Sequence, residues 1–205
     1  MDGGIAPGGR IGPNAIIQAA AALDAALSVA EVDALFAEAG LARYRRAPPD
    51  GMVEEREVTA LHRVLRARLP EDRLAALVRE AGWRTGDYLL AHRIPRPVQW
   101  VLKRLPAPLA ARLLLSAIRR HAWTFVGSGR FEARPGRPLR LAIAGCPLCR
   151  GAQVARPACD YYAASFERLF AALVHPRARV TEVACEAMGD AACLFAVEWR
   201  GPAAR

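Results

Sequence analysis

Hydrophobic residues recur every three or four positions through the first half of the chain. Between residues 13 and 27 they form one apolar stripe, which predicts an amphipathic helix. Ser28 and Glu31 follow with the spacing of a capping box, so a second helix is expected to begin there and to end at Gly40. A loop with adjacent prolines is expected over 43–51. Further helices are expected over 54–68, 70–82 (stopping at Gly82), 86–93 and 109–120.

The hydrophobic period shortens after His121, from about 3.6 residues to about 2. Pro135 and Gly136 mark a turn between two alternating runs, which is typical of a β-hairpin. Strands are expected over 123–133, 139–143, 179–186 and 193–199, and a helix over 159–174. This order predicts an α+β fold in which amino-terminal helices pack on an antiparallel sheet, with the order β-β-α-β-β in the carboxyl-terminal half.

The composition is that of a globular protein. The chain has 205 residues, of which 53% are hydrophobic and 24% are charged, and this excludes disordered, collagen-like and disulfide-scaffold classes. We expect a helical extension over 1–40 followed by a main domain over 41–205. No run of about 18 uncharged apolar residues occurs, so no transmembrane segment is expected. The first fifteen residues lack a signal-peptide pattern, which favours the cytoplasm.

Basic residues are in excess, and the formal net charge is +9. The excess lies in the middle of the chain, where residues 40–140 hold 21 basic side chains against nine acidic ones. These arginines recur at helical spacing among leucines, whereas nucleic-acid binders interleave basic residues with stacking aromatics or glycines. Nucleic acid is therefore not expected as a partner. A solvated helix face, or a face that meets an acidic protein or a carboxylated ligand, is favoured.

The five cysteines all lie in the last 60 residues, at Cys146, Cys149, Cys159, Cys185 and Cys193. An odd number without a secretion signal argues against disulfides and favours metal binding or redox chemistry. Cys185 and Cys193 flank a predicted tight turn, so a hairpin would bring their sulfurs to one end of the sheet. Glu182 precedes Cys185 by three residues, so a regular strand would place the two on opposite faces unless a bulge intervenes. Cys159 begins a predicted helix, whose dipole favours a thiolate there.

The run Glu-x-x-Cys-x-x-x-Gly-Asp-x-x-Cys-x-Phe, from Glu182 to Phe195 and preceded by Cys159, resembles the 4-vinyl reductase domain family. The resemblance is most specific over the last 90 residues and implies that 41–205 form a ligand-binding domain with a metal site. The zinc ligands that it implies are Cys159, Glu182, Cys185 and Cys193. Three thiolates and one carboxylate would give a structural Zn²⁺ a closed tetrahedral shell.

Cys146 and Cys149 form a separate Cys-x-x-Cys pair with Pro147 between them. In a competing interpretation this pair takes the place of Glu182, because thiolates alone hold zinc or an iron–sulfur cluster. A redox pair is another alternative. The sequence leaves the role of these two cysteines open.

The resemblance also implies a function in bacteriochlorophyll biosynthesis and photosynthesis. The protein would bind a divinyl magnesium tetrapyrrole similar to divinyl protochlorophyllide, as a carrier or accessory to pathway enzymes such as magnesium chelatase. We expect a homodimer, in the cytoplasm or at the periphery of the photosynthetic membrane.

Two other interpretations of the function remain. One is reduction of the 4-vinyl (8-vinyl) group of divinyl chlorophyllides with an external reductant, which the family name suggests. No nicotinamide or flavin motif is present, because Gly127-Ser128-Gly129 lies in a predicted hairpin and is followed by Arg130. The other is a scaffold that binds only proteins.

Aromatic residues near the predicted junction of helices and sheet are the candidate ligand pocket. They are Trp83, Tyr88, His92, Trp100, His121, Trp123 and Phe125. His92 or His121 could give an axial nitrogen to magnesium, since neutral imidazole is a common metal ligand. Arg119 and Arg120 could pair with propionate groups.

Overall fold

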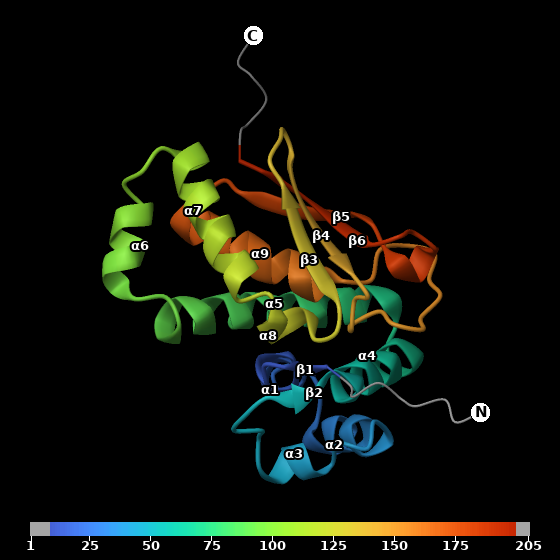
Figure 1. The fold of residues 1–205 in the computed structure, drawn as a ribbon. Helices are drawn as coiled ribbons and strands as arrows, with labels where there is room; N and C mark the ends of the chain where they lie inside the picture. The colour runs from blue at the N-terminus through green and yellow to red at the C-terminus, as the bar shows by residue number, and fades with distance from the viewer. Residues whose placement is uncertain (1–8, 200–205) are drawn as a thin grey trace, which may run out of the picture.

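The computed structural model describes residues 9–199, and the described chain begins with a group of short elements (Figure 1). These are β1 (Arg10–Ile11), α1 (Asn14–Asp24), α2 (Val29–Glu38), α3 (Arg43–Arg46), β2 (Val53–Glu54) and α4 (Glu55–Arg68). β1 and β2 pair antiparallel, an element that two-residue strands are too short to signal in a sequence pattern.

The capping box at the start of α2 is confirmed. The Ser28 hydroxyl accepts from the Glu31 N–H, and the Glu31 carboxylate accepts from the Ser28 N–H at 2.8 Å. The loop expected over 43–51 is only partly correct, because its first residues form one helical turn, α3. Arg45 of this turn donates to both carboxylate oxygens of Asp24 at 2.8 Å, which ties α3 to the end of α1.

α5 (Glu71–His92) is one continuous helix of 22 residues, so the expected helix end at Gly82 and the separate segment over 86–93 are wrong. Gly82 and Gly86 both face α9 (Asp160–Leu173). A Cβ added to Gly86 would lie 2.6 Å from the Cβ of Arg168. These glycines therefore allow two helices to approach closely instead of ending one.

α5 is followed by α6 (Arg96–Leu102), α7 (Ala107–Arg120) and α8 (Trp123–Val126). The strand expected to begin at Trp123 is wrong, because α8 is a single helical turn. Its buried residue is Val126, while Trp123 is 60% exposed. Gly127 ends the turn with φ of 59°, a conformation that favours glycine, and it lies against the carboxylate of Glu55. The alternation of residue types here does not follow the pleat of a sheet.

Four antiparallel strands form the main sheet, in the order β3-β4-β6-β5. They are β3 (Arg130–Arg134), β4 (Leu139–Ala144), β5 (Arg179–Ala184) and β6 (Cys193–Glu198). The hairpin turn predicted at Pro135 and Gly136 joins β3 to β4, and a 3-10 turn, η1 (Glu186–Met188), lies between β5 and β6. Leu141 pairs with Phe195 on the buried face of the sheet, where the Phe195 ring meets Phe166 of α9 at 5.7 Å between centroids.

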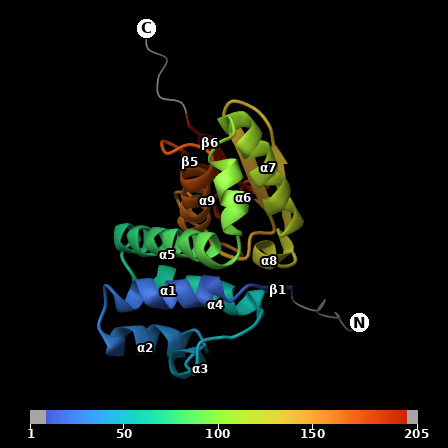
Figure 2. The same ribbon diagram turned by 90° about the vertical axis from the view of Figure 1, so that its left-hand side faces the viewer.

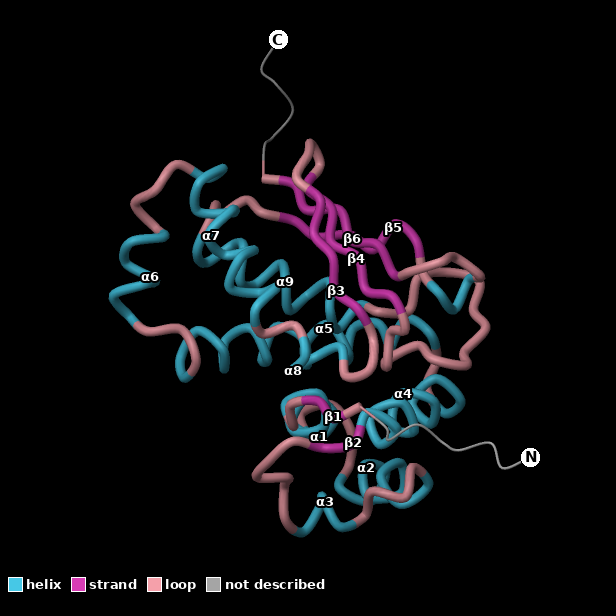
Figure 3. Tube along the Cα trace, viewed as in Figure 1, coloured by secondary structure: helices cyan, strands magenta, loops and turns pink. Residues whose placement is uncertain are grey.

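α5 lies at the centre of the molecule (Figure 2). It packs on α1 on one side and on α9 on the other, and α9 packs in turn against β5. Figure 3 shows the main sheet gathered beyond α9, away from the amino-terminal helices. The predicted α+β class and the β-β-α-β-β order are confirmed.

The boundary predicted at residue 40 stays a prediction, and residues 1–8 of that extension lie outside the described residues. Over 9–199, the helices are too short or too polar for any of them to traverse a bilayer.

Candidate functional site

All five cysteines meet in one buried cluster, in which each residue is at most 1% exposed. The Sγ atom of Cys146 lies 3.5 Å from that of Cys159, and the Sγ atom of Cys149 lies 3.5 Å from that of Cys193. Cys193 Sγ also lies 3.6 Å from Cys159 Sγ and 3.8 Å from Cys185 Sγ. The cluster joins three segments, namely the loop after β4, the start of α9 and the β5–β6 hairpin.

The four residues predicted as zinc ligands are brought together, with donor atoms within 4.8 Å of one another. The bulge that this arrangement needs is present, because the register of β5 against β6 shifts between Glu182 and Ala184. The Cys159 N–H, just before α9, donates to Glu182 Oε2 at 2.7 Å. Oε1 of Glu182 is buried and has no partner among residues 9–199, and burial raises the pKa of this carboxyl to about 8. A cation beside Oε1 would satisfy it.

The Cys-x-x-Cys pair belongs to the same cluster. Cys146 and Cys149 form a second group of four donors with Cys159 and Cys193, again within 4.8 Å of one another. Hydrogen bonds from the neighbouring thiols, that of Cys146 first, lower the pKa of Cys149. The alternative in which this pair supplies metal ligands therefore has the geometry that it requires.

Hydrogen bonds from outside the cluster hold the loop that carries this pair. The Glu186 carboxylate accepts from the N–H groups of Gly145 at 2.6 Å and Cys146 at 2.7 Å. Thr59 and Arg66 of α4 donate to the carbonyl oxygens of the two residues between the cysteines, at 2.6 and 2.7 Å. The loop is thus fixed from both sides by groups that are not metal ligands.

The chemistry of the donors fits a divalent metal ion. Thiolates are soft donors that suit zinc and do not suit magnesium or calcium. A tetrahedral ion with Zn–S bonds of about 2.3 Å places neighbouring sulfurs about 3.8 Å apart. The shortest sulfur–sulfur distances in the cluster, 3.5 to 3.8 Å, are close to this value. The cluster can therefore hold a metal ion.

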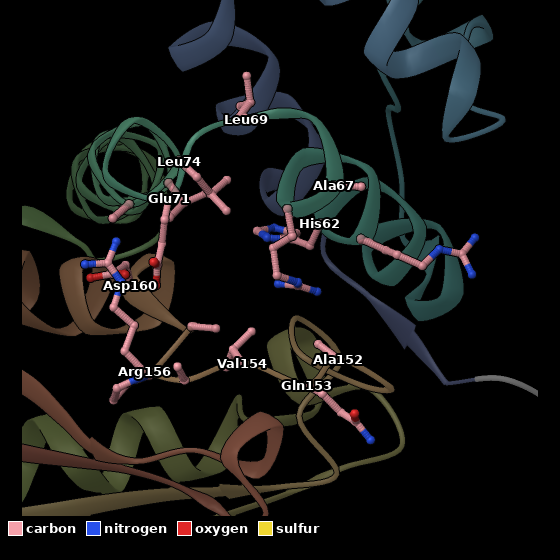
Figure 4. Close-up of a pocket in the computed structure, with 17 residues that line it drawn as sticks. His62, Ala67, Leu69, Glu71, Leu74, Ala152, Gln153, Val154, Arg156 and Asp160 are labelled. Atoms are coloured by element: carbon pink, nitrogen blue, oxygen red, sulfur yellow. Dashed lines mark ion pairs between the residues drawn. The ribbon is translucent and has the colours of Figure 1, made fainter.

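A cavity of about 490 Å³ opens beside the cluster, between α4, the start of α5 and residues 152–160 (Figure 4). Its lining includes the apolar side chains Leu69, Leu74, Val78 and Val154 and the basic side chains Arg63, Arg66 and Arg156. Arg156 is neutralised by ion pairs with Glu71 and Asp72. Arg63 forms no ion pair with any other residue that the structure describes. The cavity thus combines an apolar wall with available positive charge.

His62 of α4 also lines this cavity, and the sequence did not single it out. It is 3% exposed, and its Nε2 atom has no hydrogen-bond partner in the described chain. Burial, followed by the charge of Arg66, lowers the pKa of His62 to about 3, so the imidazole is neutral at pH 7. Its position beside Leu61 on the buried face of α4 was the available signal, because a polar side chain there needs a partner.

The seven residues predicted as a ligand pocket do not form one site. Tyr88 and His92 lie close together on α5, with ring centroids 4.8 Å apart. Trp83, Trp100 and Trp123 are exposed on three different helices. Phe125 packs among core aromatic rings, and His121 is exposed at the end of α7. None of the seven, all within the described chain, lines the cavity of Figure 4, and their contact with a ligand stays a prediction.

Comparison with known proteins places these features in context. Residues 139–199, which include β4, α9 and the β5–β6 hairpin, match the model of the 4-vinyl reductase domain family. All five cysteines and Glu182 lie within the matched region.

Two curated relatives match nearly the whole chain. The "Bacteriochlorophyll synthase 23 kDa chain" of Cereibacter sphaeroides is 47% identical over 95% of this chain and 93% of its own length. The protein of the same description from Rhodobacter capsulatus is 44% identical over 94% of this chain and 88% of its own length.

Proposed function

The chain belongs to the family of the bacteriochlorophyll synthase 23 kDa chains and carries a 4-vinyl reductase domain, and on this premise we propose that it binds a divinyl magnesium tetrapyrrole and delivers it to the enzymes of bacteriochlorophyll synthesis. Involvement in bacteriochlorophyll biosynthesis follows from the family. Pigment binding is the proposed step, and the observation that carries it is the cavity between α4, α5 and residues 152–160.

The chemistry of the cavity suits one edge of such a pigment. Its volume of about 490 Å³ is in the range of small-molecule sites, and its apolar wall suits the face of a macrocycle. Arg63 and Arg66 can pair with a propionate carboxylate. The neutral imidazole of His62 offers an unpartnered Nε2 atom to magnesium or to a polar substituent.

We propose zinc as the ion of the cysteine cluster, with a structural role. The support is the donor set, which is mostly thiolate and fully enclosed by protein. Such an ion would fasten the β5–β6 hairpin to the start of α9 and to the loop after β4, beside the cavity. Its binding energy would add directly to the stability of the fold.

The proposal extends to the setting of the protein. We place the chain beside pathway enzymes such as magnesium chelatase, as a homodimer in the cytoplasm or at the periphery of the photosynthetic membrane. The support is the family resemblance and the printed name of the relatives, which describes them as one chain of a synthase.

Titration of the purified protein with divinyl protochlorophyllide, followed by absorbance and fluorescence, tests pigment binding. We expect saturable binding that Arg66→Gln weakens by about tenfold or more, because a hydrogen bond to a charged group contributes about 1.5–3 kcal/mol. Arg112→Gln, an exposed arginine of α7 away from the cavity, is the matched control. Absence of saturable binding at tens of micromolar pigment would end the proposal.

Two further outcomes of this experiment discriminate between sites and activities. Weaker binding in Trp83→Ala or Trp123→Ala, with unchanged binding in Arg66→Gln, would move the pigment to the predicted aromatic set. Turnover of the vinyl group when NADPH or reduced ferredoxin is added would favour the reductase alternative over carriage.

A further inference from the structure

The two groups of four donor atoms in the cysteine cluster overlap in two residues, Cys159 and Cys193. Two tetrahedral ions that share two ligands need six donors in total. The cluster contains six: the five thiols and the Glu182 carboxylate. We propose that it is a binuclear site for two divalent, zinc-type ions, bridged by the thiolates of Cys159 and Cys193.

The sulfur contacts follow the connectivity that this site requires. One ion would be bound by Cys146 and Cys149, and each of these lies 3.5 Å from one of the two shared sulfurs. The other ion would be bound by Cys185 and Glu182, and Cys185 lies 3.8 Å from the shared sulfur of Cys193. The shared sulfurs lie 3.6 Å apart, between the two unshared pairs of ligands.

A single ion would leave two donors of the cluster without a metal bond. An ion in the group that contains Glu182 leaves Cys146 and Cys149 idle, each fully buried and 3.5 Å from a thiolate ligand. An ion in the four-cysteine group leaves Cys185 idle and Glu182 with a buried oxygen that has no partner in the described chain. Burying such groups without a partner costs free energy, and two ions remove both costs.

The local charges are compatible with this stoichiometry. Five thiolates and one carboxylate carry six negative charges, of which two divalent ions balance four. The half-buried guanidinium of Arg66, which donates to the loop between Cys146 and Cys149, lies next to the remaining negative charge. The positive end of the α9 dipole lies at Cys159.

The loop of Cys146 and Cys149 is also held without any ion. Glu186, Thr59 and Arg66 anchor its backbone, so both halves of the site are positioned by protein groups before metal binds. Preorganised ligands of this kind lower the cost of binding the second ion.

Metal content of the full chain, purified with zinc and measured by elemental analysis against amino-acid analysis, tests the proposal. We expect two zinc ions per chain in the native protein and one in the Cys146→Ser/Cys149→Ser double variant. The exposed Ser116→Ala of α7 is the control, with two. Cadmium-113 NMR of the cadmium-loaded native protein is expected to give two resonances split by coupling through the shared thiolates.

The remaining outcomes overturn the binuclear site. One ion per chain, retained in the double variant, would place a single ion at the Glu182 group. One ion that is retained in Cys185→Ser and lost in the double variant would place it among the other four cysteines. The inference rests on the zinc part of the proposed function and is independent of pigment binding. One ion would overturn only the bridged pair, whereas no ion would overturn the zinc proposal as well.

Discussion

Gly82 of α5 lies directly against the backbone of Tyr161 in α9. A Cβ on Gly82 would lie 3.0 Å from the carbonyl carbon of Tyr161 and 2.9 Å from the Cβ of Ala164, and its carbonyl oxygen accepts from the Ser165 hydroxyl at 3.0 Å. One turn later the hydroxyls of Thr85 and Tyr161 are 2.7 Å apart. The two central helices are therefore joined by polar contacts that only a small residue at position 82 permits.

Gly82→Ala is expected to destabilise the protein, although alanine is the better helix former by about 1 kcal/mol. The added methyl group meets backbone atoms that cannot move without separating α5 from α9, and overpacking of this kind costs about 1–3 kcal/mol. Urea unfolding followed by circular dichroism measures the change. Gly51→Ala is the control, because nothing lies within 4 Å of the Cβ position there. Equal stability of the two variants would contradict the close approach.

Glu55→Gln is expected to lower the free energy of unfolding by about 3 kcal/mol, the low end of the cost of breaking a buried ion pair. The Glu55 side chain is 5% exposed and accepts from Arg150 at 2.6 Å and from the hydroxyl of Ser128 at 2.6 Å. Burial alone would raise the pKa of Glu55, but the hydrogen bonds from Arg150 and Ser128 outweigh it and the pKa is lowered.

The sign of the pH dependence follows from that lowered pKa. The unfolded chain takes up the proton first, near pH 4.5, so the stabilisation by the ionised Glu55 is fully present above this pH. It is lost as the pH falls through the lower value of the folded state. The stability difference between the native protein and Glu55→Gln should be constant from pH 5 to 8 and shrink below that range. Glu54→Gln removes a carboxylate from an exposed pair with Arg56 and should change stability little at any pH.

Ser28→Ala is expected to cost about 1 kcal/mol, because it removes the side-chain acceptor for the Glu31 N–H at the start of α2. Thermal unfolding is a sufficient measurement. Ser116→Ala, at an exposed position inside α7, has no cap to lose and should be neutral or slightly stabilising. A loss of the same size at both positions would argue against the capping box as the cause.

Removal of metal is expected to lower the Tm by more than about 10 °C, because structural zinc contributes several kcal/mol and about 1 kcal/mol moves the Tm by 2–4 °C in a chain of this size. Unfolding scans with and without a strong chelator, followed by addition of zinc, measure the loss and its recovery. The thiols and Glu182 must lose protons to bind, so metal release should increase as the pH falls. An unchanged Tm after confirmed metal removal would deny the ion a structural role.

Local signals in the sequence predicted much of this fold for physical reasons. The cap at Ser28, the turn at Pro135 and Gly136, and the amphipathic spacing of α4 and α9 each depend on residues close together in the chain. The bulge after Glu182 was also predictable, because a shared metal site with Cys185 is incompatible with a regular strand.

The errors came from positions whose role is set by distant residues. Gly82 looks like a helix end until α9, some 80 residues later in the chain, is packed against it. Gly127 looks like part of a strand until the Glu55 carboxylate is placed beside it. The cavity around His62 combines α4 with residues 152–160, so no continuous stretch of sequence displays it. Likewise, spacing alone could not reveal that Cys146 and Cys149 lie beside the sulfurs of Cys159 and Cys193.

Arg66 takes part in two places at once, since it lines the cavity and also donates to the backbone between Cys146 and Cys149. A guest that recruits this guanidinium draws it away from the cysteine loop. Thermodynamic reciprocity then requires that whatever the guest does to metal affinity, the metal does equally to guest affinity. The zinc supply of the cell would thus set how firmly the chain retains its cargo, and cobalt in place of zinc would make the cluster a coloured reporter of occupancy.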